Sequence, residues 1–347
     1  MIIYHIADVH LGSKMLSLKE EVASKRRNKI FSFLTDAFKR IHDEGSHIVL
    51  LPGDIFDEDS PLENDLENFY HLILSYPDIN FYYLRGNHDL IKHQNNIDNL
   101  FYFDSKFKIY KDGDINIGGI ELNKDNLSSF YNEIKFNEDE YNILMLHGDI
   151  NNDIDLKKLK DKNIDYIALG HLHTYQKGEL DKRTSYAYSG VFLGRGNDET
   201  NLKGYIRFNT SNNDISFIPS SKEIILEDDI DISTALSSFE AANIIKNKYK
   251  DMNIILRLNI VGDIKFSRPS EGIKQYLENL LSDYYLSISI KDHTSDYIDI
   301  DSYTHSKSFI GEFINTVNNN SSLSIEEKKK IIYLGIKALK GEIKGWD

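Results

Sequence analysis

The beginning of the chain alternates between short apolar segments and longer amphipathic ones, and this alternation restricts the fold more than any other feature. Apolar, β-branched and aromatic residues predict buried strands at 2–7, 47–51 and 79–84. Between them, apolar residues at helical spacing predict helices at about 19–44 and 62–75. Strands that alternate with helices form a parallel sheet with helices packed on it. The sequence therefore predicts an α/β fold.

The later parts of the chain show three different patterns. Further short strands, which complete a two-sheet core flanked by helices, are predicted at 141–146, 164–169, 186–189, 204–209 and 215–218. A small α+β unit follows, and two amphipathic helices come last, the second preceded by a capping box of Ser324 and Glu327. One face of this last helix is predicted to be lined by Ile325, Ile332, Ile336, Leu339 and Ile343. We therefore predict three domains, with bounds of 1–220, 221–300 and 301–347.

The composition restricts the compartment and the cofactors. The chain of 347 residues is long for a single core, and it contains no cysteine. The missing thiols exclude a disulfide framework and a thiolate zinc site, and they favour a reducing cytoplasm. We identify no secretory signal at the start and no apolar run near the roughly 20 residues that span a bilayer. The net charge of −14 argues against a nonspecific grip on nucleic acid, although bound metal ions and local basic patches still permit DNA binding.

Clusters of Asp, Asn and His follow the predicted strands, where each strand ends. They occur in the segments DVH, GD, GNHD, HGD and GHLH, and their polar members are Asp8, His10, Asp54, Asn87, His88, Asp89, His147, His171 and His173. In open α/β sheets, ligands bind at the carboxyl ends of the strands, so these side chains are expected to converge. Any one cluster alone is compatible with a turn or with ordinary histidines. Five clusters in succession, each at a strand end, indicate a single site.

The chemistry of these side chains points to metal ions. Oxygen and nitrogen donors without sulfur suit Mn²⁺, Fe, Zn²⁺ or Mg²⁺. The donors are too many for one ion and fit two ions that share a bridging carboxylate. Two ions about 4 Å apart can clamp a phosphate, activate water and stabilise a leaving oxygen. Other histidines are interpreted as ordinary surface or core residues, namely His5, His42, His47, His71 and His93.

The five motifs resemble those of the calcineurin-like metallophosphoesterase superfamily. Within it, DVHLG, GDIFD, RGNHDL and the segment 188–205 resemble the SbcD-type DNA repair nucleases. The short length and the two-helix tail further resemble the phage members of that family, which are recombination endonuclease subunits. The resemblance implies a DNA exonuclease and single-strand endonuclease that serves DNA repair, recombination and replication. It also implies the host cytoplasm as the location if the chain is phage-encoded.

The resemblance implies a role for each polar residue of the motifs. One metal would be held by Asp8, His10 and His173, and the other by Asn87, His147 and His171. Asp54 would bridge both ions, which the family prefers as Mn²⁺, with Mg²⁺ as the alternative. His88 would stabilise or protonate the leaving group, with Asp89 as its orienting partner. This chain has Asp57 at a position where many cellular relatives have a second histidine. The resemblance therefore leaves the leaving-group chemistry open.

The resemblance also implies partners for the later regions. Residues 221–300 match the position of a domain that caps DNA, and residues 305–347 match the segment that docks on an SbcC-type coiled-coil ATPase. A homodimer formed through the catalytic domain is expected as well. The alternative for the tail is a helical hairpin folded back on its own domain. For the whole chain, the alternatives are another phosphoesterase of the superfamily, acting on phosphoproteins or small phosphodiesters, and a non-catalytic scaffold, which the intact ligand set disfavours.

Overall fold

The computed structural model of the chain describes residues 1–16, 18, 20–57, 63–89, 97–196, 199–250, 252–297, 299–304 and 308–339. Two residues of the predictions, His93 and Ile343, lie outside the described residues. The chain divides into two compact units, of which the first comprises Met1–Glu227, Asp251–Arg257 and Tyr285–Ile288. The second comprises Asp228–Lys250, Leu258–Tyr284 and Ser289–Asp347. No helix in the described part is long and apolar enough to cross a membrane.

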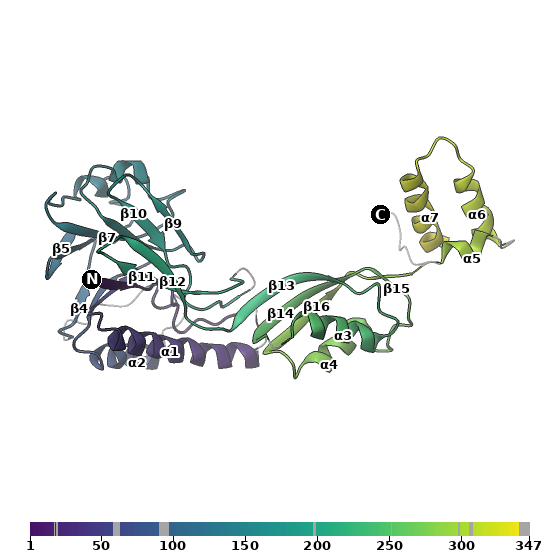
Figure 1. Cartoon of the computed structure of the whole chain (residues 1–347), viewed down its shortest axis with the longest axis horizontal. Coiled ribbons are helices and arrows are strands. Elements are labelled where there is room, and N and C mark those ends of the chain that lie inside the picture. Colours follow the sequence, from purple (N-terminus) through teal and green to yellow (C-terminus); the bar gives the residue numbers. More distant parts are fainter. Residues whose placement is uncertain are drawn as a thin grey trace. The chain divides into compact units, whose positions relative to one another are not determined.

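The first sheet has six strands in the order β12-β11-β1-β2-β3-β4. Figure 1 labels three of them, β4, β11 and β12. Its parallel strands are β1 (Ile2–His5), β2 (Ile48–Pro52), β3 (Asn80–Leu84) and β4 (Leu100–Tyr102). β11 (Gly204–Asn209) pairs antiparallel with β1, and β12 (Asp214–Pro219) pairs antiparallel with β11. The three predicted N-terminal strands therefore lie next to one another, as the alternation with helices requires.

Two helices, α1 (Glu20–Asp43) and α2 (Glu63–Leu74), pack on one face of this sheet. Phe38 of α1 and Phe69 of α2 are fully buried in the same core as the β2 and β3 side chains. Apolar residues at helical spacing lie along one side of a helix, and this side is the one that packs on the sheet. Gly45 follows α1 with a φ of 72°, which is the left-handed conformation expected at the end of a helix.

The second sheet also has six strands, in the order β5-β6-β7-β8-β10-β9. Their bounds are β5 (Lys108–Asp112), β6 (Ile115–Gly119), β7 (Tyr141–His147), β8 (Tyr166–Gly170), β9 (Gln176–Glu179) and β10 (Ser185–Tyr188). The two sheets pack face to face, because Leu50 of β2 and Met145 of β7 belong to one buried cluster. The outer face of the second sheet is covered by two segments, one before and one after β7, which contain the short 3₁₀ helices η1 (Phe130–Asn132) and η2 (Leu156–Leu159). The predicted two-sheet α/β core is confirmed.

A smaller three-stranded sheet has the order β13-β14-β16. It comprises β13 (Ile224–Asp231), β14 (Ile254–Val261) and β16 (Ser287–Asp292), and the same region contains α3 (Ser238–Lys248) and α4 (Ile273–Leu281). Two further strands of two residues each pair in parallel: β15 (Asp263–Ile264) comes after β14, and β17 (Ser295–Asp296) comes after β16. The predicted small α+β unit is therefore present.

The described part of the chain ends in a helical hairpin made of α5 (Ile300–Thr304), α6 (Phe309–Asn318) and α7 (Ile325–Leu339). The predicted capping box is confirmed at the start of α7. The backbone N–H of Ser324 donates to Glu327 Oε2 at 2.8 Å, and the backbone N–H of Glu327 donates to Ser324 Oγ at 3.3 Å.

The hairpin has a small core of its own, which is formed by Ile314, Val317, Ile332 and Ile336. The apolar stripe predicted for the last helix is only partly covered by this core. Ile332 and Ile336 are buried, whereas Ile325 is 76% exposed and Leu339 is 44% exposed. The middle of the stripe therefore packs inside the hairpin, and its described ends do not.

Candidate metal centre

The segments that follow β1 and β2 run side by side and bring the first two polar clusters together. The backbone N–H groups of Asp8 and His10 donate to the carbonyls of Gly53 and Asp54, at 3.1 and 3.0 Å. Asp8, His10 and Asp54 have φ values of 50°, 52° and 52°. Side chains other than glycine seldom adopt this left-handed conformation, and it is concentrated at functional sites, where it directs a side chain that a regular strand would place elsewhere.

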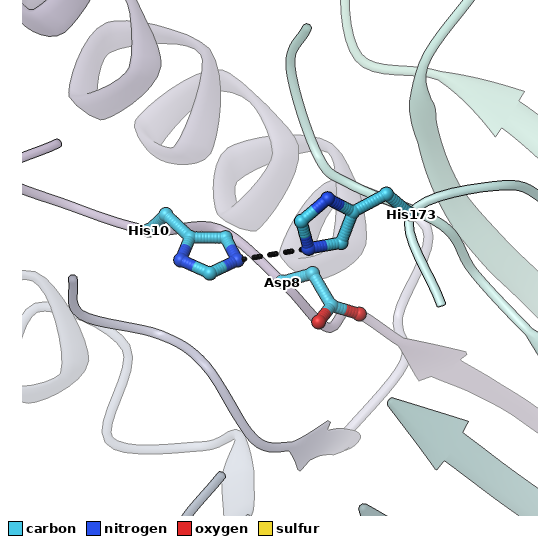
Figure 2. A group of neighbouring side chains, drawn as sticks. All are labelled: Asp8, His10 and His173. Atoms are coloured by element: carbon cyan, nitrogen blue, oxygen red, sulfur yellow. Dashed lines mark hydrogen bonds between the residues drawn. The ribbon is translucent and has the colours of Figure 1, made fainter. Parts of the chain in front are cut away.

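A first group of side chains consists of Asp8, His10 and His173, whose potential ligand atoms all lie within 4.8 Å of one another. His10 Nε2 is 3.3 Å from His173 Nε2, and Figure 2 shows the two rings facing each other beside the Asp8 carboxylate. The backbone N–H of His171 donates to Asp8 at 3.0 Å. Asp8 and His10 are buried. The cluster after β1 and the cluster after β8 thus meet in space.

A second group consists of Asp54, His147 and His171. Asn87 joins it, because its Oδ1 lies 3.0 Å from His147 Nε2 and 3.2 Å from His171 Nδ1. Asp54 connects the two groups, since its Oδ2 is 3.3 Å from His147 Nε2 and 4.0 Å from His10 Nε2. The side chains predicted to converge do so, and a single carboxylate lies between them.

Burial and mutual charge strongly perturb the acid–base properties of these residues. Burial raises the pKa of Asp8 to about 7. Burial would also raise the pKa of Asp54, but the hydrogen bond and charge of His147 outweigh it and hold that pKa well below its usual range. Burial would lower the pKa of His147, but the hydrogen bond and charge of Asp54 raise it to about 9. Burial lowers the pKa of His10 and keeps its imidazole neutral.

The residues present fit two divalent ions. His10 Nε2 faces the donors of both groups, at 3.3 Å from His173 Nε2 and 4.0 Å from Asp54 Oδ2. Burial favours the neutral imidazole, which is the state that a metal ligand requires. Carboxylate, amide and imidazole donors together suit Mn²⁺, Mg²⁺, Fe or Zn²⁺. A third group, His10, Asp57 and His88, shares His10 with the first, so the first two groups could hold one ion each, with Asp54 near both.

His88 lies at the edge of this centre. Its backbone N–H donates to Asp54 Oδ1 at 2.9 Å, and its ring centroid is 5.2 Å from that of His10. The side chain is 35% exposed, and its Nδ1 is 3.9 Å from Asp57 Oδ1. His88 is thus accessible from outside while it remains next to the buried donors.

Asp89 has a different environment from His88. Its buried carboxylate accepts the backbone N–H groups of Phe56 and Gly86 at 2.8 and 2.9 Å. Asp89 therefore ties the segment after β2 to the segment after β3. A side chain at Gly86 would collide with the Asp54 carboxylate, which explains the glycine at this position.

Sequence reasoning missed two charged residues of the centre, Arg195 and Glu199. Glu199 Oε1 lies 2.9 Å from His173 Nδ1. Arg195 contacts Glu199 at 2.7 Å and Asp57 at 3.2 Å. Both residues belong to the segment 188–205, which resembles the SbcD-type nucleases. The one available signal was this pair of opposite charges directly after the buried residues 191–193.

The other histidines of the described part lie elsewhere. His5 is fully buried, where its Nε2 donates to the Leu169 carbonyl at 3.2 Å and its Nδ1 lies 2.9 Å from the Tyr166 hydroxyl. Three others that were interpreted in this way, His42, His47 and His71, are partly or largely exposed on the surface. Their interpretation as ordinary core or surface histidines agrees with these positions.

Comparison with known proteins places the chain in a family. The sequence model of calcineurin-like phosphoesterases matches residues 1–175, the part that carries all five motifs. The chain belongs to the calcineurin-like phosphoesterase family. Members of this family are metal-dependent phosphoesterases that normally bind two divalent ions, in agreement with the two groups of donors found here.

Two known proteins show more distant similarity. The DNA double-strand break repair protein Mre11 of Methanococcus maripaludis is 25% identical over 212 residues, which cover 54% of this chain and 55% of that protein. The chain thus spans about half the length of this curated relative. A solved structure, the 5′-nucleotidase from Candida albicans SC5314, matches 60% of this chain and 52% of that chain, with 16% identity and a TM-score of 0.36.

Proposed function

We propose that the chain is a metal-dependent DNA nuclease, the SbcD-type subunit of an ATP-dependent DNA repair and recombination complex. The observation that carries phosphoester hydrolysis is the position of Asp54 between two groups of donors. DNA as the substrate is supported by the similarity to a protein named for DNA double-strand break repair. The additional α+β and helical regions support it further, because hydrolysis of a small phosphoester does not need them.

The ligand assignment follows the two groups. Asp8, His10 and His173 would hold one ion, Asn87, His147 and His171 would hold the other, and Asp54 would serve both. Mn²⁺ is the proposed ion, with Mg²⁺ as the alternative. Two such ions, when bound, activate the attacking water as Lewis acids and neutralise the charge that develops on the phosphate.

His88 takes the catalytic role that does not need a metal. Water attacks phosphorus and loses a proton to the solvent, and the bond to the leaving oxygen breaks. His88, when protonated, gives its proton to that oxygen and regains one from the solvent. The exposed position of His88 beside the buried donors supports this role, because a substrate must reach the residue. Asp57 lies near the same ring and takes the orienting role that the resemblance implied for Asp89. The Asp89 carboxylate instead accepts the backbone N–H groups of Phe56 and Gly86.

The later regions supply the partners in this proposal. Residues 221–300 act as a DNA capping domain. The tail, residues 301–347, binds an SbcC-type coiled-coil ATPase, and two copies of the catalytic domain form a homodimer. Ile331 and Leu334 of α7 are 37% and 47% exposed, and they are three residues apart, so they share a helix face. This pair of exposed apolar residues supports the tail as the docking segment.

Mn²⁺-dependent cleavage of DNA by the purified full chain tests the proposed function. Single- and double-stranded DNA are offered in separate reactions, and bis-nitrophenyl phosphate is the control substrate. We expect cleavage of DNA and of the small ester by the wild type, and neither by Asp54→Asn. Cleavage of the small ester without any cleavage of DNA would favour a small phosphodiesterase of the same family. Activity on a phosphoprotein alone would favour a phosphatase.

A further inference from the structure

The first donor group lies next to a segment that we call the clamp segment, which consists of residues 189–196 and 199–203. The backbone N–H of Ala7 donates to Ser189 Oγ at 3.1 Å, and the backbone N–H of Phe192 donates to the Asp8 carbonyl at 3.1 Å. On the other side, Lys203 Nζ donates to the His173 carbonyl at 3.1 Å. The clamp segment therefore contacts the chain at or beside both Asp8 and His173.

Within the clamp segment, Glu199 determines which nitrogen of His173 is free. Its Oε1 is 2.9 Å from His173 Nδ1, and Glu199 is only 3% exposed. A carboxylate can only accept this hydrogen bond, so Nδ1 carries the proton and the lone pair belongs to Nε2. His173 Nε2 is the atom that faces His10 at 3.3 Å. The glutamate thus presents the metal-binding nitrogen of His173 to the first donor group.

Glu199 is itself held in place by arginine. Arg195 Nη2 lies 2.7 Å from Glu199 Oε1, and Arg195 Nη1 lies 3.2 Å from Asp57 Oδ2. A second arginine, the buried Arg26 of α1, donates to the Gly194 carbonyl and so anchors the clamp segment. Because Glu199 is buried and paired, its carboxylate cannot turn away from His173 without breaking an ion pair.

In the second donor group, a ligating imidazole is hydrogen-bonded to a different kind of acceptor. His147 Nδ1 lies 3.0 Å from the backbone carbonyl of Pro52, which is a neutral acceptor. A carboxylate acceptor makes a ligating imidazole more basic than a carbonyl does, and loss of such a partner weakens metal binding. The two groups therefore depend on different residues outside the donor set.

We propose that Glu199, held by Arg195, is a positioning residue that strengthens metal binding selectively at the Asp8–His10–His173 group. This inference rests on the proposed function, since it takes that group as a metal site. Neither Glu199 nor Arg195 needs to touch the metal or the substrate. Loss of the Glu199 charge weakens the binding of one of the two ions and leaves the binding of the other unchanged.

The test is a titration of the metal-free full-length protein with Mn²⁺, in which free Mn²⁺ is followed by electron paramagnetic resonance. Wild type is expected to bind two ions per chain. Glu199→Gln is expected to bind one ion about 10- to 100-fold more weakly and the other with unchanged affinity. Glu199→Asp keeps the charge and should restore part of the affinity. Arg195→Gln should shift the same ion in the same direction by a smaller factor.

A matched control comes from a second, partly buried ion pair of the same unit. Asp165 pairs with Arg183 at 2.9 Å and does not touch the donor groups, so Asp165→Asn should bind both ions as wild type does. Unchanged binding of both ions by Glu199→Gln, or equal weakening of both, would overturn the inference. If that variant does not fold, Arg195→Gln decides in the same way. A wild-type chain that binds fewer than two Mn²⁺ ions would instead overturn the proposed function.

Discussion

The Oδ2 atom of Asp54 lies 3.3 Å from Nε2 of His147, and both side chains are buried. The carboxylate is anionic because the hydrogen bond and charge of His147 hold its pKa well below the usual range despite its burial. The same carboxylate oxygen faces His10 at 4.0 Å. Asp54 is therefore a carboxylate that faces ligand atoms of both donor groups.

Asp54→Asn should abolish nearly all activity and remove at least one bound metal ion. The amide keeps the shape of the side chain but loses the negative charge that two cations would share. The measurement is Mn²⁺ content per chain together with the rate of DNA cleavage. A variant that keeps two ions and full activity would show that Asp54 does not bridge them.

His88→Ala should retain both metal ions and DNA binding, with a turnover reduced by on the order of 10²-fold or more. The reason is that His88 is accessible at the edge of the centre, where it can protonate a leaving oxygen without ligating a metal. Metal content and single-turnover rates are measured on the same preparation. His71→Ala, on the exposed face of α2, is the control and should behave as wild type. If metal content falls in proportion to activity, His88 is a ligand.

Leu334→Glu should leave the hairpin folded and weaken binding to an SbcC-type ATPase. Leu334 is 47% exposed on α7, so a charge there costs little in the free protein but would be buried in a complex. Ile336→Glu should instead unfold the hairpin, because Ile336 belongs to its core. Co-purification with the ATPase and thermal unfolding followed by circular dichroism separate these effects. Wild-type binding by a double variant, Ile331→Glu with Leu334→Glu, would exclude this face as the docking surface.

Deletion of residues 305–347 should leave a folded enzyme that retains its metal ions and its intrinsic Mn²⁺-dependent nuclease activity. The hairpin has its own small core, and the donor groups lie in the other compact unit. The truncated chain should no longer co-purify with the ATPase or respond to ATP. Aggregation, or a large drop in melting temperature of the donor-containing unit, would indicate that the tail serves the chain's own stability.

The buried His5 should make the stability of the protein depend on pH. Burial lowers its pKa from the ordinary value of 6.5 to about 3. Between these values the unfolded chain binds a proton that the folded chain does not, so stability is full above about pH 6.5 and falls as the pH decreases toward 3. The slope is roughly 1.4 kcal/mol per pH unit.

His5→Gln removes this proton-binding group and should flatten the pH dependence. The free energy of unfolding of metal-free protein is measured in urea at about pH 7.5 and about pH 5. Wild type should lose roughly 2 kcal/mol more than the variant between these conditions. Parallel losses in the two proteins would mean that His5 does not differ in protonation between the folded and unfolded states.

The convergence of the donors was predictable because strand ends have a fixed direction in a parallel sheet. Asp8 and Asp54 follow neighbouring strands, and the apolar runs before them show where those strands end. The contact between Glu199 and His173 was not predictable in the same way. It joins a segment without regular structure to the end of a strand, and no periodicity in the sequence relates the two.

The hairpin shows a second limit of periodicity. Helical spacing put Ile325, Ile332, Ile336 and Leu339 on one face, but only Ile332 and Ile336 are buried within the chain. Spacing defines a stripe along a helix, whereas burial depends on what lies opposite each part of it. In the described residues, α6 and its neighbours cover the middle of that stripe and leave both of these residues exposed.

Strand β1 pairs with β2 on one side and with β11 on the other, where Ile2 is opposite Asn209. During translation, β2 is available soon after β1 leaves the ribosome, but β11 is synthesised much later. Until then, β1 is an apolar edge strand, and such edges pair readily with other chains. Nascent chains that stop before β11 are therefore expected to aggregate or to require a chaperone. The Asp8 loop is therefore made well before Phe192, whose backbone N–H holds it in place.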